Sequence, residues 1–170
     1  TIQNCIIKNN TATAWGGGIT SSGSSAIFKN LLIINNIAGI GGGIAIIAGS
    51  PSIINCTVSN NNGEQGIRLQ HNANLSIINS IFYGNEGGQI HFRVVDDPST
   101  LNISYCFLPG GQDSIVTNDN GTIIWGSGNI DVNPMFVDTA DGNYNLLASS
   151  QLINGGHPDS TDSDGSRADM

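Results

Sequence analysis

Two short stretches of the sequence place basic and amide side chains at matching positions. In "GIRLQ", residues 66 to 70, an isoleucine is followed by Arg68 and Gln70, and in "QIHFR", residues 89 to 93, an isoleucine is followed by His91 and Arg93. A cation can neutralise the carboxylate of an acidic sugar, and a neighbouring base can remove the adjacent proton. These four residues are therefore candidates for contact with a polysaccharide. The sequence does not identify a catalytic residue among them.

The neighbours of this cluster leave two interpretations open. Close to the cluster in sequence are further titratable residues, which would complete the catalytic groups of a lyase: Glu64, His71, Asp96 and Asp97. The matching positions of the preceding line hold only Ala45 and Ile47, so the polar residues are confined to two lines. Charged side chains on a surface strand are usually solvated, and the cluster could equally be an ordinary sheet face. Elsewhere in the sequence, Trp15 and Trp125 could be platforms for stacking on a sugar, although a tryptophan beside a glycine-rich loop could equally cover the edge of the core.

A second candidate site is the acidic stretch "DSTDSDGSRAD", residues 159 to 169. It gathers hard oxygen ligands around an Asp-Gly turn, which suits Ca²⁺. The aspartates concerned are Asp159, Asp162, Asp164 and Asp169. The stretch lacks the closing Glu of an EF-hand. The alternative is an acidic turn neutralised in part by Arg167, so Ca²⁺ is a candidate ligand and no cofactor is required.

Charge is distributed unevenly along the 170 residues, which carry a net charge of -8. The cations Lys8, Lys29, Arg68 and Arg93 precede residue 96, whereas eleven aspartates follow residue 95 with only Arg167 to offset them. No basic stripe exists to neutralise phosphates, so nucleic-acid binding is disfavoured. Every apolar run is interrupted by Gly, Asn or Ser, and the sequence predicts no membrane-spanning helix.

The elements that must position these residues recur with a period of about 25 residues. Lines that align "IQNC", "FKNL", "IINC", "IINS" and "ISYC" share a column whose members are Asn4, Asn30, Asn55, Asn79 and Tyr105. Six residues beyond the asparagines stand Asn10, Asn36, Asn61 and Asn85, and a later column holds Ile19, Ile44, Ile67 and Ile90. The triplets in "AWGGGI" and "GIGGGI" are equivalent corners of two lines, with no lysine or helix start after them, which excludes a phosphate-binding loop. Such a period is typical of a solenoid.

Each line contains three short alternating stretches punctuated by Asn and Gly, which predicts an all-β, parallel β-helix with three strands per coil. Inward columns should hold Ile2, Phe28, Ile53, Ile77 and Ile103 on one wall and Ile19, Ile44, Ile67 and Ile90 on another. We expect Asn4, Asn30, Asn55 and Asn79 to form a hydrogen-bonded ladder, closed by Tyr105. Cys5, Cys56 and Cys106 share one column two coils apart, too far for a disulfide, and should be free, buried thiols.

The lines "NCIIKNNTATAWGGGI" and "NCTVSNNNGEQGI" resemble the repeats of right-handed parallel β-helix proteins of the pectate-lyase-like superfamily, especially those of bacterial exported surface and polymorphic outer-membrane proteins. The resemblance implies a right-handed helix whose active sites, where present, lie on the outer face of the first sheet. It also implies a closing segment like "NPMFVDTADGNYNLLASSQLINGG". The Ca²⁺-binding aspartates that pectate lyases carry on that sheet are missing here. The superfamily includes lyases, hydrolases, adhesins and stalks, so the resemblance concerns architecture.

We therefore expect five or six coils over residues 1–131 and an acidic closing segment over residues 132–170 that folds back over the last coil. Its anchors should be Phe136, Tyr144, Leu146 and Ile153. The favoured function is a non-catalytic stalk or adhesin module of an exported, extracellular or cell-surface protein, which could contact a polysaccharide or host glycan. The alternative is a polysaccharide lyase or glycoside hydrolase. Further coils or domains of the same polypeptide are the expected partners.

Overall fold

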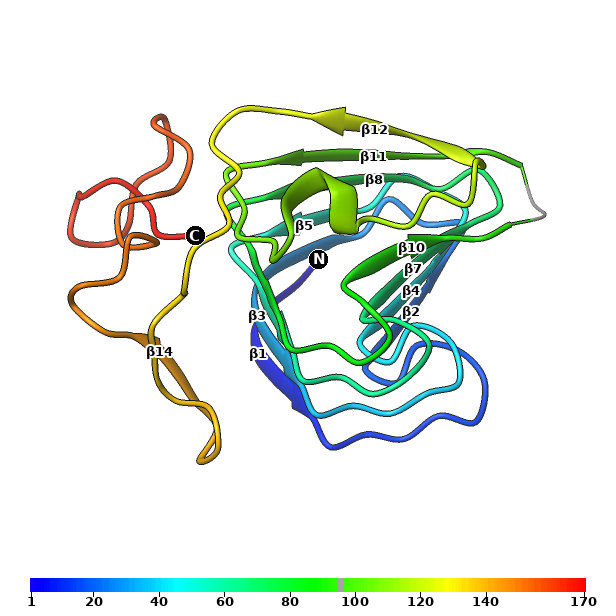
Figure 1. The fold of residues 1–170 in the computed structure, drawn as a ribbon, viewed down its shortest axis with the longest axis horizontal. Coiled ribbons are helices and arrows are strands. Elements are labelled where there is room, and N and C mark those ends of the chain that lie inside the picture. The colour runs from blue at the N-terminus through cyan, green and yellow to red at the C-terminus, as the bar shows by residue number, and fades with distance from the viewer. Residues whose placement is uncertain (95–96) are drawn as a thin grey trace.

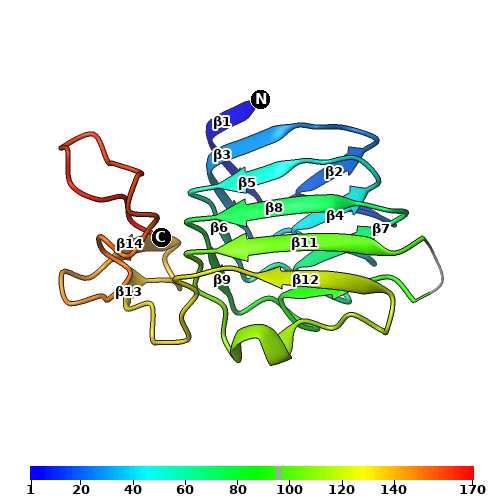
Figure 2. The same cartoon turned by 90° about the horizontal axis from the view of Figure 1, so that it is seen from above.

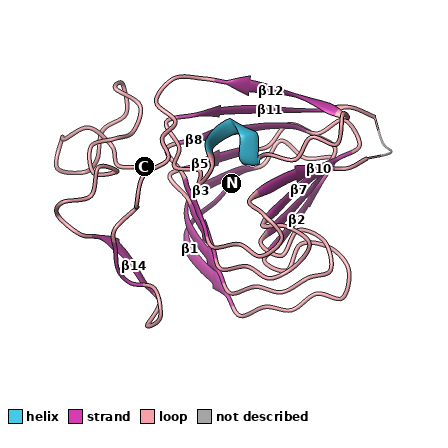
Figure 3. Ribbon diagram, in the orientation of Figure 1, coloured by secondary structure: helices cyan, strands magenta, loops and turns pink. Residues whose placement is uncertain are grey.

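The computed structural model describes residues 1–94 and 97–170, and the chain winds into a right-handed parallel β-helix of about five coils. Figure 1 looks along the stack of coils, and Figure 2 shows the same stack from the side. Among these described residues, strands and loops make up nearly all of the fold, apart from one short 3₁₀ helix, η1 (Gly111–Ser114) (Figure 3). The predicted fold class is confirmed.

One wall of the solenoid is a four-stranded parallel sheet. It consists of β2 (Ile19–Ser22), β4 (Ile44–Ile47), β7 (Ile67–Gln70) and β10 (Ile90–Phe92), in the order β10-β7-β4-β2. The register aligns Ile19, Ile44, Ile67 and Ile90, as the sequence repeat predicts. Their side chains are buried, because every second residue of a strand points to the same face. This sheet positions the candidate basic cluster on its outer side.

The other walls belong to an eight-stranded sheet that bends at the asparagine column. Its strands are β1 (Ile2–Lys8), β3 (Ile27–Ile34), β5 (Ser52–Ile54), β6 (Thr57–Ser59), β8 (Asn74–Ile78), β9 (Ile81–Tyr83), β11 (Ser99–Ser104) and β12 (Gly121–Trp125). The predicted inward column is in register from Ile2 to Ile103. Phe28, Ile53, Ile77 and Ile103 are at most 2 % exposed, whereas Ile2, in the first coil, is 42 % exposed.

The predicted asparagine ladder is present in part. Asn4, Asn30, Asn55, Asn79 and Tyr105 all adopt the left-handed conformation, with φ between 50° and 56°, and so form the corner at which the wall bends. Asparagine tolerates this conformation better than most residues. Two amide pairs are hydrogen-bonded, from Asn30 to Asn4 (2.9 Å) and from Asn79 to Asn55 (3.4 Å). We call these five residues the corner column.

A continuous ladder lies in the other asparagine column, which we call the inner ladder: Asn10, Asn36, Asn61 and Asn85. The Oδ1 atoms of Asn36, Asn61 and Asn85 each accept two bonds of 2.9 to 3.0 Å, from the backbone N–H and the side-chain amide of the asparagine one coil earlier. Gln89 ends the ladder, because its Oε1 accepts a bond from Asn85 Nδ2. Asn36, Asn61 and Asn85 are at most 6 % exposed, whereas Asn4 and Asn30 in the corner column are exposed and Asn55 is half-buried. A buried amide must find protein partners, which explains the continuous bonding of the inner ladder.

In the first three coils, the glycine that directly precedes the buried isoleucine of the four-stranded sheet makes room for the inner ladder. A Cβ atom at Gly18, Gly43 or Gly66 would lie within about 3.1 Å of the amide of Asn36, Asn61 or Asn85. In the next coil Gln89 occupies the equivalent position and bonds the ladder directly. The glycine repeat is therefore a structural joint.

The three cysteines are free, but only two are buried. Cys56 and Cys106 lie in the core, where burial raises the pKa of Cys56 to about 11 and that of Cys106 to about 12. The prediction was wrong for Cys5, which is exposed in the first coil of the solenoid, on β1. The two buried thiols act as small hydrophobic groups.

The closing segment lies along the flank of the solenoid, so the prediction that it folds over the last coil was wrong (Figure 2). Its hairpin of β13 (Phe136–Asp138) and β14 (Asn143–Leu146) sits beside the third coil, where Tyr144 Oη accepts a hydrogen bond from Asn60 Nδ2 (2.8 Å). Leu152 packs with Ile81 and Phe107 in a second, smaller apolar cluster. Ile81, on β9, and Phe107, which forms a parallel bridge with it, supply the apolar surface that directs the segment to this flank. The end of the solenoid is instead bordered by η1.

Candidate functional site

The four-stranded sheet brings the predicted basic cluster together on its outer face. His91 pairs in register with Arg68 on the adjacent strand, and Arg68 in turn pairs with Ala45. Arg93 directly follows β10, and its backbone N–H donates to the carbonyl of Leu69 (2.9 Å). Arg68, Gln70, His91 and Arg93 thus lie on two neighbouring coils, as the repeat predicts.

The cluster is more enclosed than a solvated sheet face would be. Gln70 is 2 % exposed, and its Oε1 has no hydrogen-bond partner in the structure. The Arg68 side chain is only 12 % exposed, and its Nη1 lies 3.9 Å from Oε2 of Glu64, which is itself well exposed. Ala45, on the coil before Arg68, is 1 % exposed. His91 and Arg93 are half-buried and form the accessible part of the cluster.

Trp15 belongs to this site, although it lies far from Arg93 in the sequence. Its half-buried indole ring lies under the guanidinium of Arg93, with 5.8 Å between Cζ and the ring centroid. The loop that holds Trp15 is fixed to β2 by a hydrogen bond from Thr20 Oγ1 to the Trp15 carbonyl (3.1 Å). A cation over an aromatic face is a stabilising contact. Residue type alone points to Trp15 and Trp125 equally, and the repeat does not predict that Trp15 meets Arg93.

His91 is biased toward its neutral form. Burial lowers the pKa of His91 below its ordinary value of 6.5, the nearby Arg68 guanidinium lowers this pKa further, and Glu64 acts in the opposite direction. The ring lies against the preceding loop, since a Cβ at Gly88 would be 2.7 Å from His91 Nε2. The site therefore combines a neutral imidazole with guanidinium groups, which can accept a proton and hold an anion respectively.

The other residues named for a lyase site do not complete it. His71 lies in the turn after β7, and Asp97 lies exposed beyond β10. Asp96 lies outside the described residues. The coil carrying β4 contributes Ala45 and Ile47 to the same face, so the polar cluster stays confined to the coils of β7 and β10.

The four aspartates proposed for Ca²⁺ lie in the closing segment, and three of them accept local hydrogen bonds. Asp164 Oδ1 accepts from Ser166 N and Oγ, Asp162 Oδ2 accepts from Asp169 N, and Asp169 Oδ1 accepts from Asn154 N. Asp159 lies beside His157, 4.0 Å from its Nδ1. Within residues 1–94 and 97–170, no three His, Cys, Asp or Glu residues gather closely enough to hold a metal ion. The Ca²⁺ site stays a prediction.

Known proteins share the repeat architecture of this chain. A family model described as a right handed beta helix region matches residues 1–151. No curated protein and no solved structure matches the chain. In the part of the chain that the structure describes, no helix has the length and apolar character needed to cross a membrane.

Proposed function

Because the chain belongs to the right-handed β-helix family, we propose that it serves as a non-catalytic module of an exported or cell-surface protein, of the stalk or adhesin type. The outer face of the four-stranded sheet contacts an acidic glycan, and the stacked coils hold that face rigid.

The observation that carries this proposal is the cationic site formed by Trp15, His91 and Arg93 over Arg68. A guanidinium donates hydrogen bonds to carboxylate or sulfate groups, and an aromatic ring packs against the apolar face of a sugar. Arg93 and Trp15 are already in contact, so little side-chain freedom would be lost on binding. Arg68 lies in register with His91 on the adjacent strand.

Enclosure of Arg68 favours binding over turnover. A lyase needs its cation against the carboxylate of the reacting sugar. Here Arg68 is nearly buried and lies near Glu64, so a substrate carboxylate would have to displace the side chains that cover it.

One observation favours a polysaccharide lyase as the second candidate. His91 has a lowered pKa and lies in register with Arg68, and a neutral base beside a cation is the arrangement that β-elimination requires. In this case Arg68 would neutralise the uronate carboxylate and His91 would remove the proton. A glycoside hydrolase has no comparable support among the described residues.

A binding assay and a product assay on the same samples separate the two functions. Polygalacturonate, alginate and heparin are titrated against wild type, Arg93→Gln, Trp15→Ala and Lys29→Gln, while absorbance reports unsaturated product. We expect Arg93→Gln and Trp15→Ala to weaken binding about tenfold and Lys29→Gln, a cation on another wall, to leave it unchanged. Binding should also weaken as salt is added. Turnover abolished by Arg68→Ala or His91→Gln would replace the proposal with the lyase.

A further inference from the structure

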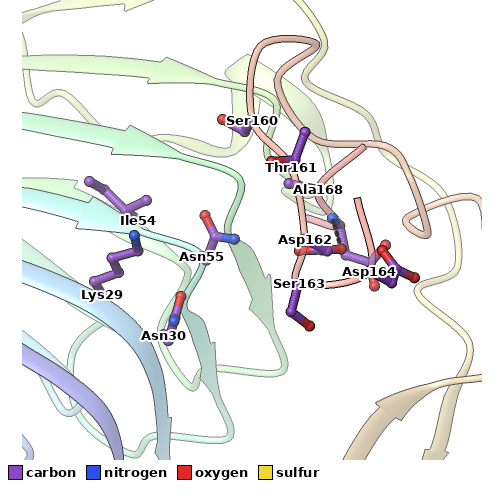
Figure 4. Close-up of a pocket in the computed structure, with 11 residues that line it drawn as sticks. Lys29, Asn30, Ile54, Asn55, Ser160, Thr161, Asp162, Ser163, Asp164 and Ala168 are labelled. Carbon is purple, nitrogen blue, oxygen red and sulfur yellow. Dashed lines mark hydrogen bonds between the residues drawn. The ribbon is translucent and has the colours of Figure 1, made fainter. Parts of the chain in front are cut away.

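A cavity of about 710 Å³ lies on the opposite flank of the molecule, between the corner column and the closing segment. Figure 4 shows Asn30 and Asn55 on the solenoid side, with Asp162, Ser163 and Asp164 on the facing loop. Lys29 also lines the cavity. The volume falls within the range of small-molecule binding sites.

The corner column is interrupted at this cavity. Asn30 donates its amide to Asn4, and Asn55 accepts from Asn79, but no bond joins Asn30 to Asn55. The lower part of the column is covered, because the backbone N–H of His157 donates to Asn79 Oδ1 (2.7 Å) and the His157 ring packs on Tyr105. Asn30 therefore keeps an acceptor and Asn55 a donor where the column borders the cavity.

The facing loop supplies acceptors that its own contacts hold in place. Asp164 binds Ser166 through Oδ1, and Asp162 binds the backbone of Asp169 through Oδ2. An ionised carboxylate can accept about four hydrogen bonds, so each group retains capacity for a ligand. Ser160 and Ser163 add hydroxyl groups to the lining.

The charge of the cavity excludes the ligands expected on the opposite wall. Asp162, Asp164 and Asp169 line it against the single cation Lys29. A uronate or a sulfated sugar would meet a net negative surface, whereas an uncharged ligand would not. Only Ile54 and Ala168 contribute apolar side chains to the lining, which gives an apolar peptide little surface to bury.

We propose that this cavity binds a neutral saccharide. One sugar hydroxyl can donate to Asn30 Oδ1 and accept from Asn55 Nδ2, and so bridge the interruption in the column. Neighbouring hydroxyls donate to Asp162 and Asp164. The site is separate from the cationic face and its ligand differs in charge, so this inference does not depend on the function proposed for that face.

Nuclear magnetic resonance of the side-chain amides tests the site directly. Glucose, galactose and mannose trisaccharides are titrated in excess chelator, with galacturonate trisaccharide as the charged comparison. We expect at least one neutral sugar to shift the amide signals of Asn30 and Asn55 in a saturable way, while galacturonate binds about tenfold more weakly or not at all. If no neutral sugar shifts these signals, or if galacturonate binds as well, the proposal is wrong.

Three variants locate the binding. Asn55→Gly keeps a residue that tolerates the left-handed backbone and removes the amide, and Asp164→Asn keeps the acceptor for Ser166 and removes the charge. Each should weaken the neutral sugar about fivefold or more. Asp159→Asn, outside the lining, should not change the affinity. If Asn55→Gly does not fold, the exposed Asp164→Asn carries the test. Equal affinity in Asp164→Asn and Asp159→Asn, or shifts that need added Ca²⁺, would overturn direct recognition.

Discussion

The two asparagine columns of this solenoid have the same residue type and period but different environments. In the inner ladder, Oδ1 of Asn36, Asn61 and Asn85 accepts two bonds, and the amides of Asn36, Asn61 and Asn85 also reach the carbonyls of Ile7, Ile33 and Val58. In the corner column, Asn4 and Asn30 are exposed and Asn55 is half-buried, whereas Asn79 is buried and accepts from His157 N–H of the closing segment. The chain of amides stops between Asn30 and Asn55. The comparison teaches that burial decides whether a repeated asparagine stabilises the coils or remains available to a ligand.

Substitution of an asparagine of the inner ladder should have the largest effect on the stability of the solenoid. Asn61→Ala takes away both acceptor and donor, and it leaves the backbone N–H of Asn36 without this acceptor and Oδ1 of Asn85 without the side-chain donor in the core. We expect the free energy of unfolding to fall by about 3 kcal/mol, measured by urea denaturation. Asn62→Ala, at the exposed neighbouring position, is the control. Equal stability of the two variants would contradict the structural role of the inner ladder.

Crowding the inner ladder should cost somewhat less. Gly43→Ala would place a Cβ 3.0 Å from Asn61 Nδ2 and 2.9 Å from the Gly66 carbonyl. We expect a loss of about 2 kcal/mol in the same denaturation experiment, because the packed coils can shift only slightly. The matched control is Gly39→Ala, whose Cβ would meet its nearest neighbour at 3.5 Å. If both variants lose the same stability, contact with the ladder does not explain the glycine.

Substitution in the corner column should matter least for folding. Asn55→Gly loses only the 3.4 Å bond from Asn79 and retains a residue suited to φ > 0. The free energy of unfolding should change by about 1 kcal/mol or less. A loss as large as that of Asn61→Ala would show that the two columns stabilise the solenoid alike.

The repeat in the sequence predicts some features of the structure and not others. The period alone places the four isoleucines in one buried column and Arg68 beside His91, because stacking of equal coils leaves little choice of register. It does not tell which asparagine column is buried, since both repeat together. It also does not place the closing segment, whose position depends on single contacts such as Tyr144 with Asn60, or bring Trp15 to Arg93, because those residues do not repeat.

The pH dependence of stability should distinguish the columns from the cationic face. Neither column contains a group that titrates near neutral pH, whereas His91 has a lowered pKa in the folded state. The unfolded chain then binds more protons, so this contribution to stability is complete above pH 6.5 and is lost as pH falls through 6.5 toward the lower folded value. In His91→Gln, the loss of stability at low pH should be smaller than in wild type, whereas Asn61→Ala should show the same pH dependence as wild type. An unchanged pH profile in His91→Gln would contradict the claim that burial lowers the pKa of His91.

The most direct test of the central claim, that the cationic face binds acidic glycan without turning it over, is a long incubation with polygalacturonate in which retained complex and unsaturated product are measured together. We predict a complex that Arg93→Gln weakens about tenfold and no product above the level of the buffer alone. Product that accumulates with wild type and disappears in His91→Gln would contradict the account.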